Sequence, residues 1–239
     1  MRGKLGIKQS LIITAFVIGV EGVSQEKSCD TLFLKNIVYT LSSDSMEGRY
    51  PGTDGVKRAI KYITREFKNV SNTKIDSFTY NIEGKITEAV NIFSFIDNKA
   101  DSFIVFMAHY DHIGYGGTKS RSLISNKIHP GANDNASGVA IIIQLNHYFS
   151  KKEVRKRYKN KVNFLFVALS GHEDGLYGSR FFATNYSQIL NKTKFIINFD
   201  MVGRLNRNTP ILKLISNNIN YFEKYLNKNY PFKLIFNDE

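Results

Sequence analysis

The sequence predicts an α/β fold, a three-layer α/β/α domain with a mostly parallel central sheet. Short β-rich runs alternate with helical patterns along most of the chain, which is typical of strands joined by helices. Residues 162–169 are almost continuously apolar, as expected of a strand covered on both faces. The 239 residues suit one core of this kind, and we find no internal repeat or low-complexity linker.

The individual elements can be assigned in chain order. Apolar residues at helical spacing predict the helices, and short β-rich runs predict the strands. The helices are predicted over 31–41, 56–67, 137–149, 176–190 and 218–226, and the strands over 90–96, 103–108, 162–169, 195–199, 211–215 and 232–236. Residues 42–54, rich in Gly, Ser and Asp, are predicted to form a loop.

The first 24 residues have the three-part layout of a secretory signal peptide. Three basic residues lie within the first eight positions, residues 11–20 are uncharged and mostly apolar, and the small residues Gly22 and Ser24 follow. A run of ten residues is too short for a membrane span, which needs about 20. We therefore expect a signal peptide over 1–24, a domain over 25–239, and a secreted or periplasmic protein. A buried helix or a membrane anchor is the alternative for this segment.

The net charge of +12 raises the question of a nucleic-acid partner. Seven of the eleven residues from Lys151 to Lys161 are Lys or Arg. This run lies between a predicted helix and a predicted strand, where a solvated connection is expected. Tyr158 is its only aromatic residue, and no nucleic-acid motif accompanies it. We predict no nucleic-acid partner.

Polar side chains follow three separate predicted strands. His109 and Asp111 come directly after the strand at 103–108, Glu173 follows the apolar strand, and Asp200 comes directly after the strand at 195–199. Ligands of such sheets bind at the carboxyl ends of the strands. We therefore expect these side chains to lie close together at one edge of the sheet.

Two local patterns, one at Asp134 and one at His109 and Asp111, also have ordinary structural interpretations. Asp134 lies in a tight loop just before a predicted helix, where an Asp often serves only a turn or a cap. His109 and Asp111 could be a metal-binding His and the carboxylate that orients it, or two residues that make ordinary hydrogen bonds. Each pattern is weak alone, but their ordered combination is specific.

That ordered set resembles a known protein family, the zinc aminopeptidases of the bacterial leucyl aminopeptidase and aminopeptidase Y type. Their wider clan includes glutamate carboxypeptidases and glutaminyl cyclases. The resemblance extends from about Leu41 to Asn206 and implies a zinc-exopeptidase-like fold. It rests on the segments Ser43–Arg49, Gly52–Thr53, Ala108–His112, Gly131–Gly138, Gly171–Ser179 and Asn198–Arg204.

The resemblance implies a role for each matching residue. Asp134 would bridge two zinc ions, His109 and Asp200 would complete the first site, and Glu173 would bind the second. Asp111 would be the carboxylate behind His109. The implied reaction is metal-assisted hydrolysis of a peptide or protein substrate with a free amino terminus.

This chain departs from the family pattern in two respects. The family has Gly-Glu-Glu where this chain has Gly171, His172 and Glu173, so an imidazole occupies the position of the general base. Asp174 is the nearest other carboxylate in that segment. The family also supplies a late His to the second metal, whereas the last His here is His172. We therefore expect one zinc ion to bind well, impaired catalysis, and a domain that is incomplete at its C-terminus.

Three functions remain open from the sequence. The first is a zinc exopeptidase, active or impaired. The second is a non-catalytic relative that binds metal or another protein. The third is a cyclase acting on amino-terminal glutamine, which the bridging position of Asp134 makes less favoured.

Overall fold

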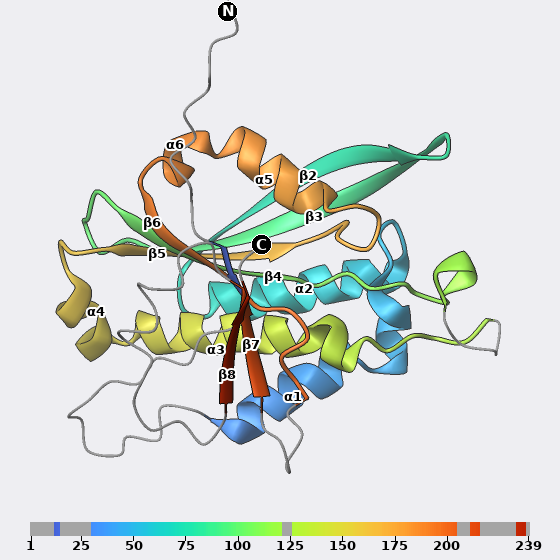
Figure 1. The fold of residues 1–239 in the computed structure, drawn as a ribbon, viewed down its shortest axis with the longest axis horizontal. Coiled ribbons are helices and arrows are strands. Elements are labelled where there is room, and N and C mark those ends of the chain that lie inside the picture. The colour runs from blue at the N-terminus through green and yellow to red at the C-terminus, as the bar shows by residue number, and fades with distance from the viewer. Residues whose placement is uncertain (1–11, 15–29, 121–125, 205–210, 216–232, 238–239) are drawn as a thin grey trace, which may run out of the picture.

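The computed structural model describes residues 12–14, 30–120, 126–204, 211–215 and 233–237. These residues form a six-stranded sheet between two layers of helices (Figure 1). The strand order is β1-β6-β4-β5-β3-β2, with β1 Ile12–Thr14, β2 Asn72–Ile82, β3 Lys85–Ile96, β4 Phe103–His109, β5 Asn163–Leu169 and β6 Thr193–Asn198. The predicted three-layer α/β/α fold is confirmed.

The sheet is mixed, and its parallel part extends from the edge strand β1 to β5. β1, β6, β4 and β5 run parallel to one another, whereas β3 pairs antiparallel with both β5 and β2. Parallel strands end at the same edge, so the carboxyl ends of β4, β5 and β6 lie next to one another. A separate two-stranded parallel sheet is formed by β7 Ile211–Ile215 and β8 Lys233–Asn237.

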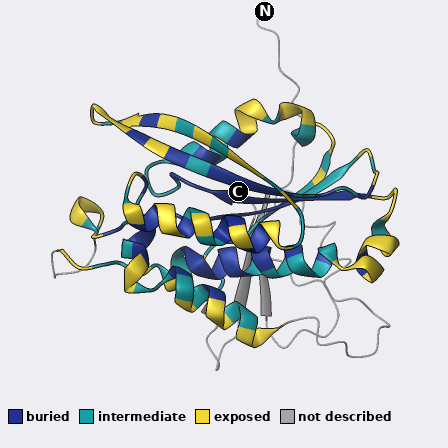
Figure 2. Ribbon diagram, turned by 180° about the vertical axis from the view of Figure 1, so that it is seen from behind, coloured by how far each residue is buried: buried dark blue, intermediate teal, exposed yellow. Residues whose placement is uncertain are grey.

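Helices cover both faces of the large sheet (Figures 1 and 2). One layer contains α5 Tyr177–Asn185 and α6 Ser187–Leu190, and the other contains α1 Thr31–Leu41, α2 Asp54–Lys68, α3 Ser137–Ser150 and α4 Lys152–Tyr158. Alternating residues of β4 enter different cores: Phe106 packs with α3, and Val105 packs with Phe182 of α5. Every residue of β5 is buried, as its apolar sequence predicted.

Most predicted elements form, with shifted ends. Helix α2 begins at Asp54 because the Thr53 hydroxyl accepts a hydrogen bond from the Val56 amide at 3.3 Å. The predicted helix over 176–190 divides into α5 and α6 at Tyr186. Residues 42–54 include a 3₁₀ helix, η1 Asp44–Arg49. Strand β7 has the predicted bounds.

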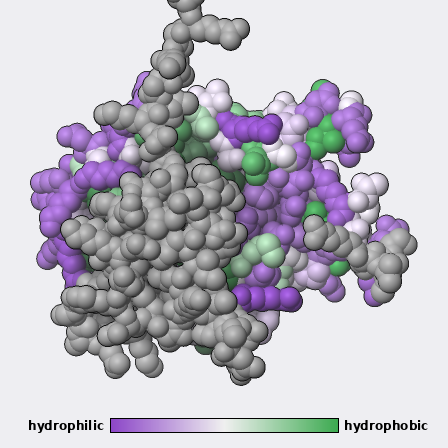
Figure 3. All heavy atoms as spheres, in the orientation of Figure 1, coloured by the Kyte–Doolittle hydropathy of each residue, from purple (hydrophilic) through white to green (hydrophobic). Residues whose placement is uncertain are grey.

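Strand β2 and helix α4 are among the elements that were not predicted. β2 pairs with β3 along its whole length, but Tyr80 is its only buried residue, so the strand carries little apolar signal. The basic segment forms the short helix α4, in which Val154 is buried and the Lys and Arg residues are exposed. A solvated segment was expected here, and most of the coloured surface in Figure 3 is hydrophilic.

Other predictions concern residues that the structure does not describe. The helix predicted over 218–226 lies outside the described residues, as does most of the predicted signal peptide. Within the latter, Ile12–Thr14 pairs with Ile196–Asn198 of β6. Among the described helices, none combines the length and apolar character needed to cross a bilayer.

Candidate metal centre

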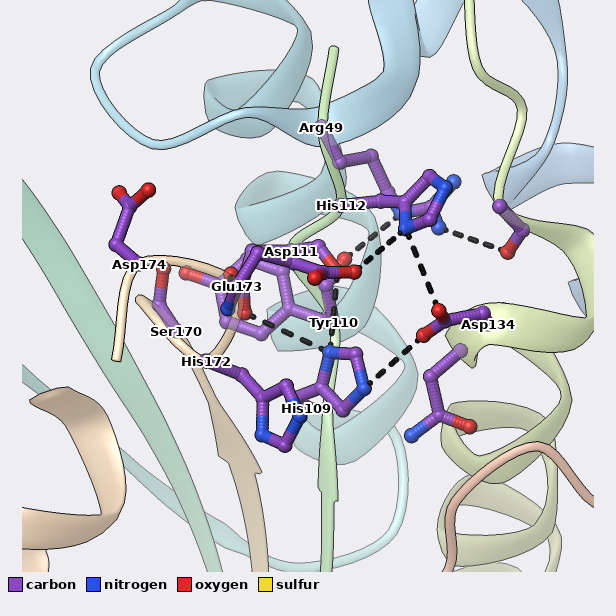
Figure 4. A network of polar contacts seen from close by, with 12 residues as sticks. Arg49, His109, Tyr110, Asp111, His112, Asp134, Ser170, His172, Glu173 and Asp174 are labelled. Atoms are coloured by element: carbon purple, nitrogen blue, oxygen red, sulfur yellow. Dashed lines mark hydrogen bonds and ion pairs between the residues drawn. The ribbon is translucent and has the colours of Figure 1, made fainter. Parts of the chain in front are cut away.

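The side chains predicted to share one edge of the sheet are brought together there (Figure 4). His109 is the last residue of β4, Asp200 follows β6, and Asp134 lies in the irregular helical segment η3 Ala132–Ala136 before α3. His109 Nε2 lies 3.3 Å from Asp134 Oδ1 and 3.4 Å from Asp200 Oδ1. Glu173 follows β5, and its amide donates to Asp111 Oδ2 at 3.2 Å.

The spacing around His109 fits a zinc ion. In tetrahedral coordination with bonds of about 2.0–2.1 Å, neighbouring ligand atoms are about 3.3–3.4 Å apart. The distances from His109 Nε2 to Asp134 and Asp200 equal that separation. His109 Nε2 and Asp200 Oδ1 are buried and have no hydrogen-bond partner among the described residues. Unpaired buried polar atoms are costly, so this arrangement favours a bound cation.

The other ring nitrogen of His109 faces Asp111. Nδ1 lies 3.1 Å from the backbone oxygen of Asp111 and 3.7 Å from its carboxylate Oδ1. A hydrogen bond at Nδ1 leaves Nε2 free to bind a metal. Asp111 is completely buried, so its carboxylate is a charge held next to the imidazole.

The electrostatics of this group favour positive charge on His109. Burial lowers the pKa of the imidazole, but the carboxylates of Asp111, Asp134 and Asp200 outweigh it and raise the pKa well above its ordinary value. His109 in turn lowers the pKa of the Asp134 carboxyl. The site thus attracts a cation. Without a metal ion, the raised pKa favours the protonated form of the His109 imidazole.

A second histidine near these residues, His112, was not assigned a role from the sequence. Its Nδ1 lies 2.8 Å from Glu173 Oε1 and 3.9 Å from Asp134 Oδ2. His112, Asp134 and Glu173 could together hold a cation, as could His109, His172 and Asp200. The sequence signal was present, because His112 follows His109 by three residues at the end of the same strand.

His172 belongs to the second of these groups and lies against His109. Its ring stacks on that of His109 with the centroids 3.8 Å apart and the planes at 6°. Its Nε2 is 3.9 Å from Asp200 Oδ2. Burial, followed by the charge of His109, lowers the pKa of His172, which favours a neutral imidazole able to accept a proton.

Asp174 is directed away from the histidines (Figure 4). Its carboxylate accepts hydrogen bonds from Tyr50 at 3.1 Å and from Tyr80 at 2.5 Å, and it pairs with Lys119. Burial and this carboxylate raise the pKa of the Tyr50 phenol to about 12. These contacts fix the segment after β5 and engage the Asp174 carboxylate away from the histidines.

The loop that carries Asp134 is held by Arg49. This side chain is completely buried, and it donates to the carbonyls of Tyr110 and Pro130 at 2.7 Å, of Gly131 at 2.9 Å, and of Leu41. Gly131 has φ +59°, and a Cβ there would lie 2.5 Å from Arg49 Nη2. A side chain at this position would therefore displace the guanidinium.

Asn135 joins the same loop to the end of β6. Its Nδ2 donates to Phe199 O at 2.8 Å, and its Oδ1 accepts from the amides of Gly138 at 3.1 Å and Met201 at 3.2 Å. Because Asn135 is adjacent to Asp134, and Phe199 and Met201 flank Asp200, these bonds set the spacing between the two carboxylates. The Asp134–Asn135 peptide bond is cis.

Comparison with known proteins identifies the family. Residues 91–233, more than half of the chain, match peptidase family M28. The chain belongs to peptidase family M28. It is 26% identical over 164 residues to a probable zinc metalloprotease of Pyricularia oryzae, covering 63% of this chain and 30% of the relative. It is 28% identical over 166 residues to a probable leucine aminopeptidase of Arthroderma otae, covering 67% and 42% respectively. This M28 chain therefore matches less than half the length of either relative.

Solved structures share the fold at lower sequence identity. A leucine aminopeptidase precursor from Bacteroides thetaiotaomicron superposes with a TM-score of 0.63 at 16% identity, over 87% of this chain and 75% of that one. A glutaminyl cyclase from Tannerella forsythia has a TM-score of 0.65 at 20% identity, with the same coverage. The fold of this M28 chain thus occurs in proteins with both names, and the side chains of the site must discriminate between the two activities.

Proposed function

We propose that this chain is the catalytic part of a secreted zinc aminopeptidase that hydrolyses peptides or proteins at a free amino terminus. The observation that carries the proposal is the position of His109 Nε2, buried and unbonded, at zinc-ligand spacing from Asp134 and Asp200. Membership of family M28 and the names of the curated relatives support the same reaction.

Each residue has a role in this proposal. His109, Asp134 and Asp200 would hold a zinc ion, which when bound polarises a carbonyl and lowers the pKa of water. Asp111 keeps His109 oriented through Nδ1. His172 accepts a proton from the attacking water and returns it to the leaving amine. An imidazole has a different reach from a carboxylate, so we expect a slower reaction than in a relative with Glu at this position.

The test is hydrolysis of leucine 4-nitroanilide by the purified chain. We expect release of nitroaniline that is lost on chelation, restored by Zn²⁺, and absent with the N-acetylated anilide. The His109→Ala variant should lose both zinc and activity. The His147→Ala variant is the matched control, because His147 bonds the Glu66 carbonyl on α2, outside the centre, and should retain both.

Other results would point elsewhere. A folded, zinc-loaded chain without hydrolysis above background would favour the non-catalytic, metal-binding or protein-binding alternative. Cyclisation of an amino-terminal glutaminyl peptide, without anilide hydrolysis, would favour the cyclase. Equal hydrolysis of the acetylated anilide would contradict recognition of a free amino terminus.

A further inference from the structure

Asp134 presents its two carboxylate oxygens to two different histidines (Figure 4). Oδ1 lies 3.3 Å from His109 Nε2, and Oδ2 lies 3.9 Å from His112 Nδ1. A carboxylate whose oxygens face separate imidazoles can bind one cation on each side. One side is the zinc site proposed above, and the other is occupied by His112 and Glu173.

The second side has the donor set and the dimensions of a zinc site. His112, Asp134 and Glu173 come from three segments, after β4, before α3 and after β5. The distances of 2.8 Å to Glu173 and 3.9 Å to Asp134 bracket the ligand separation of about 3.3–3.4 Å in tetrahedral zinc. Shifts of about half an ångström in two side chains would equalise them. One imidazole and two carboxylates are ligands that zinc commonly binds.

The charge of the centre also favours a second cation. Four carboxylates gather there, those of Asp111, Asp134, Glu173 and Asp200. A single zinc ion would offset two negative charges, and Arg49, which interacts electrostatically with Asp111 and Asp134, would offset a third. One negative charge would remain among the four carboxylates, and Glu173 lies beside His112 at 2.8 Å. Charged groups in a partly buried site need such a partner.

The family resemblance already implies a second zinc site at Asp134 and Glu173, and we propose that His112 supplies its imidazole ligand. The inference rests on the proposed zinc-peptidase function and specifies its metal content. The second ion binds more weakly than the first, because the His112 side chain is 12% exposed, whereas that of His109 is 1% exposed. The carboxylates do not separate the two sites in this way, since Glu173 is 21% and Asp200 is 27% exposed. Water competes more effectively for ligands that it can reach.

A simpler role for His112 is a hydrogen bond that only orients Glu173. His112→Gln separates the two roles, because a glutamine amide can donate to the carboxylate but is a poor zinc ligand. His112→Cys makes the opposite change, since a thiolate is a strong zinc ligand. His147→Ala again serves as the control, because it removes a histidine without touching the centre.

The experiment is equilibrium dialysis of each variant against Zn²⁺, with the fold checked by circular dichroism. We expect two ions in the unmodified chain and in His147→Ala, one in His112→Ala and His112→Gln, and two in His112→Cys. Loading His112→Cys with Co²⁺ should add a thiolate-to-cobalt absorption band that the unmodified chain lacks.

The outcomes separate this inference from the proposed function. Two ions in His112→Gln, or one ion in the unmodified chain, would overturn the role of His112 and leave the first site standing. Absence of the cobalt–thiolate band from folded His112→Cys would also overturn it. If the folded, unmodified chain binds no zinc, the proposed function fails together with the inference.

Discussion

Replacing Arg49 by methionine is expected to lower the free energy of unfolding by about 3–5 kcal/mol, the usual cost of breaking a buried charged network. The guanidinium is completely buried and donates to four backbone carbonyls from three parts of the chain. Methionine has a similar length but no donor, so the carbonyls of Tyr110 and Gly131 would be left without this partner. Urea unfolding of the metal-free chain measures the effect without a contribution from zinc.

The matched control is Arg58→Met. Arg58 lies on α2 and pairs with Glu47 at 2.7 Å, but its side chain is 43% exposed. Exposed pairs contribute at most about 1 kcal/mol, so this variant should remain close to the unmodified chain. Equal losses in the two variants would contradict a structural role specific to Arg49.

Replacing His172 by alanine is expected to lower kcat for leucine 4-nitroanilide about 10²–10⁴-fold, the contribution of a positioned general base. The imidazole stacks on His109 beside the proposed zinc ligands, with its Nε2 3.9 Å from Asp200 Oδ2. His172→Glu should retain or modestly increase the rate, because a carboxylate can accept the same proton. The zinc content of both variants should match that of the unmodified chain.

Two results would change the assignment of His172. An unaltered kcat in His172→Ala would make it a bystander. Loss of the first zinc ion in His172→Ala would make it a ligand instead, which its grouping with His109 and Asp200 allows geometrically.

The sequence predicted the residues at the strand ends because their order along the chain reflects the topology of the sheet. His109, Glu173 and Asp200 each follow an apolar strand, and parallel strands deliver such residues to one edge. Their geometry could not be predicted, because it depends on contacts distant in sequence. Asn135, for example, sets the spacing of two carboxylates through Phe199 and Met201.

The residues that sequence analysis missed are defined mainly by contacts between segments distant in sequence. His112 contacts Glu173 across 61 positions, and nothing in the spacing of the chain indicates that pair. Arg49 appeared only as part of a motif, and its burial becomes evident only when the carbonyls around it are placed. Strand β2 has mostly exposed residues, so its pairing with β3 defines it rather than its composition.

The most direct test of the proposed site is a crystal structure of the zinc-soaked chain with anomalous data collected at the zinc edge. The proposal predicts an anomalous peak about 2.0–2.1 Å from His109 Nε2 and from carboxylate oxygens of Asp134 and Asp200. A folded, zinc-loaded chain with its metal elsewhere, or with no peak between these three side chains, would contradict it.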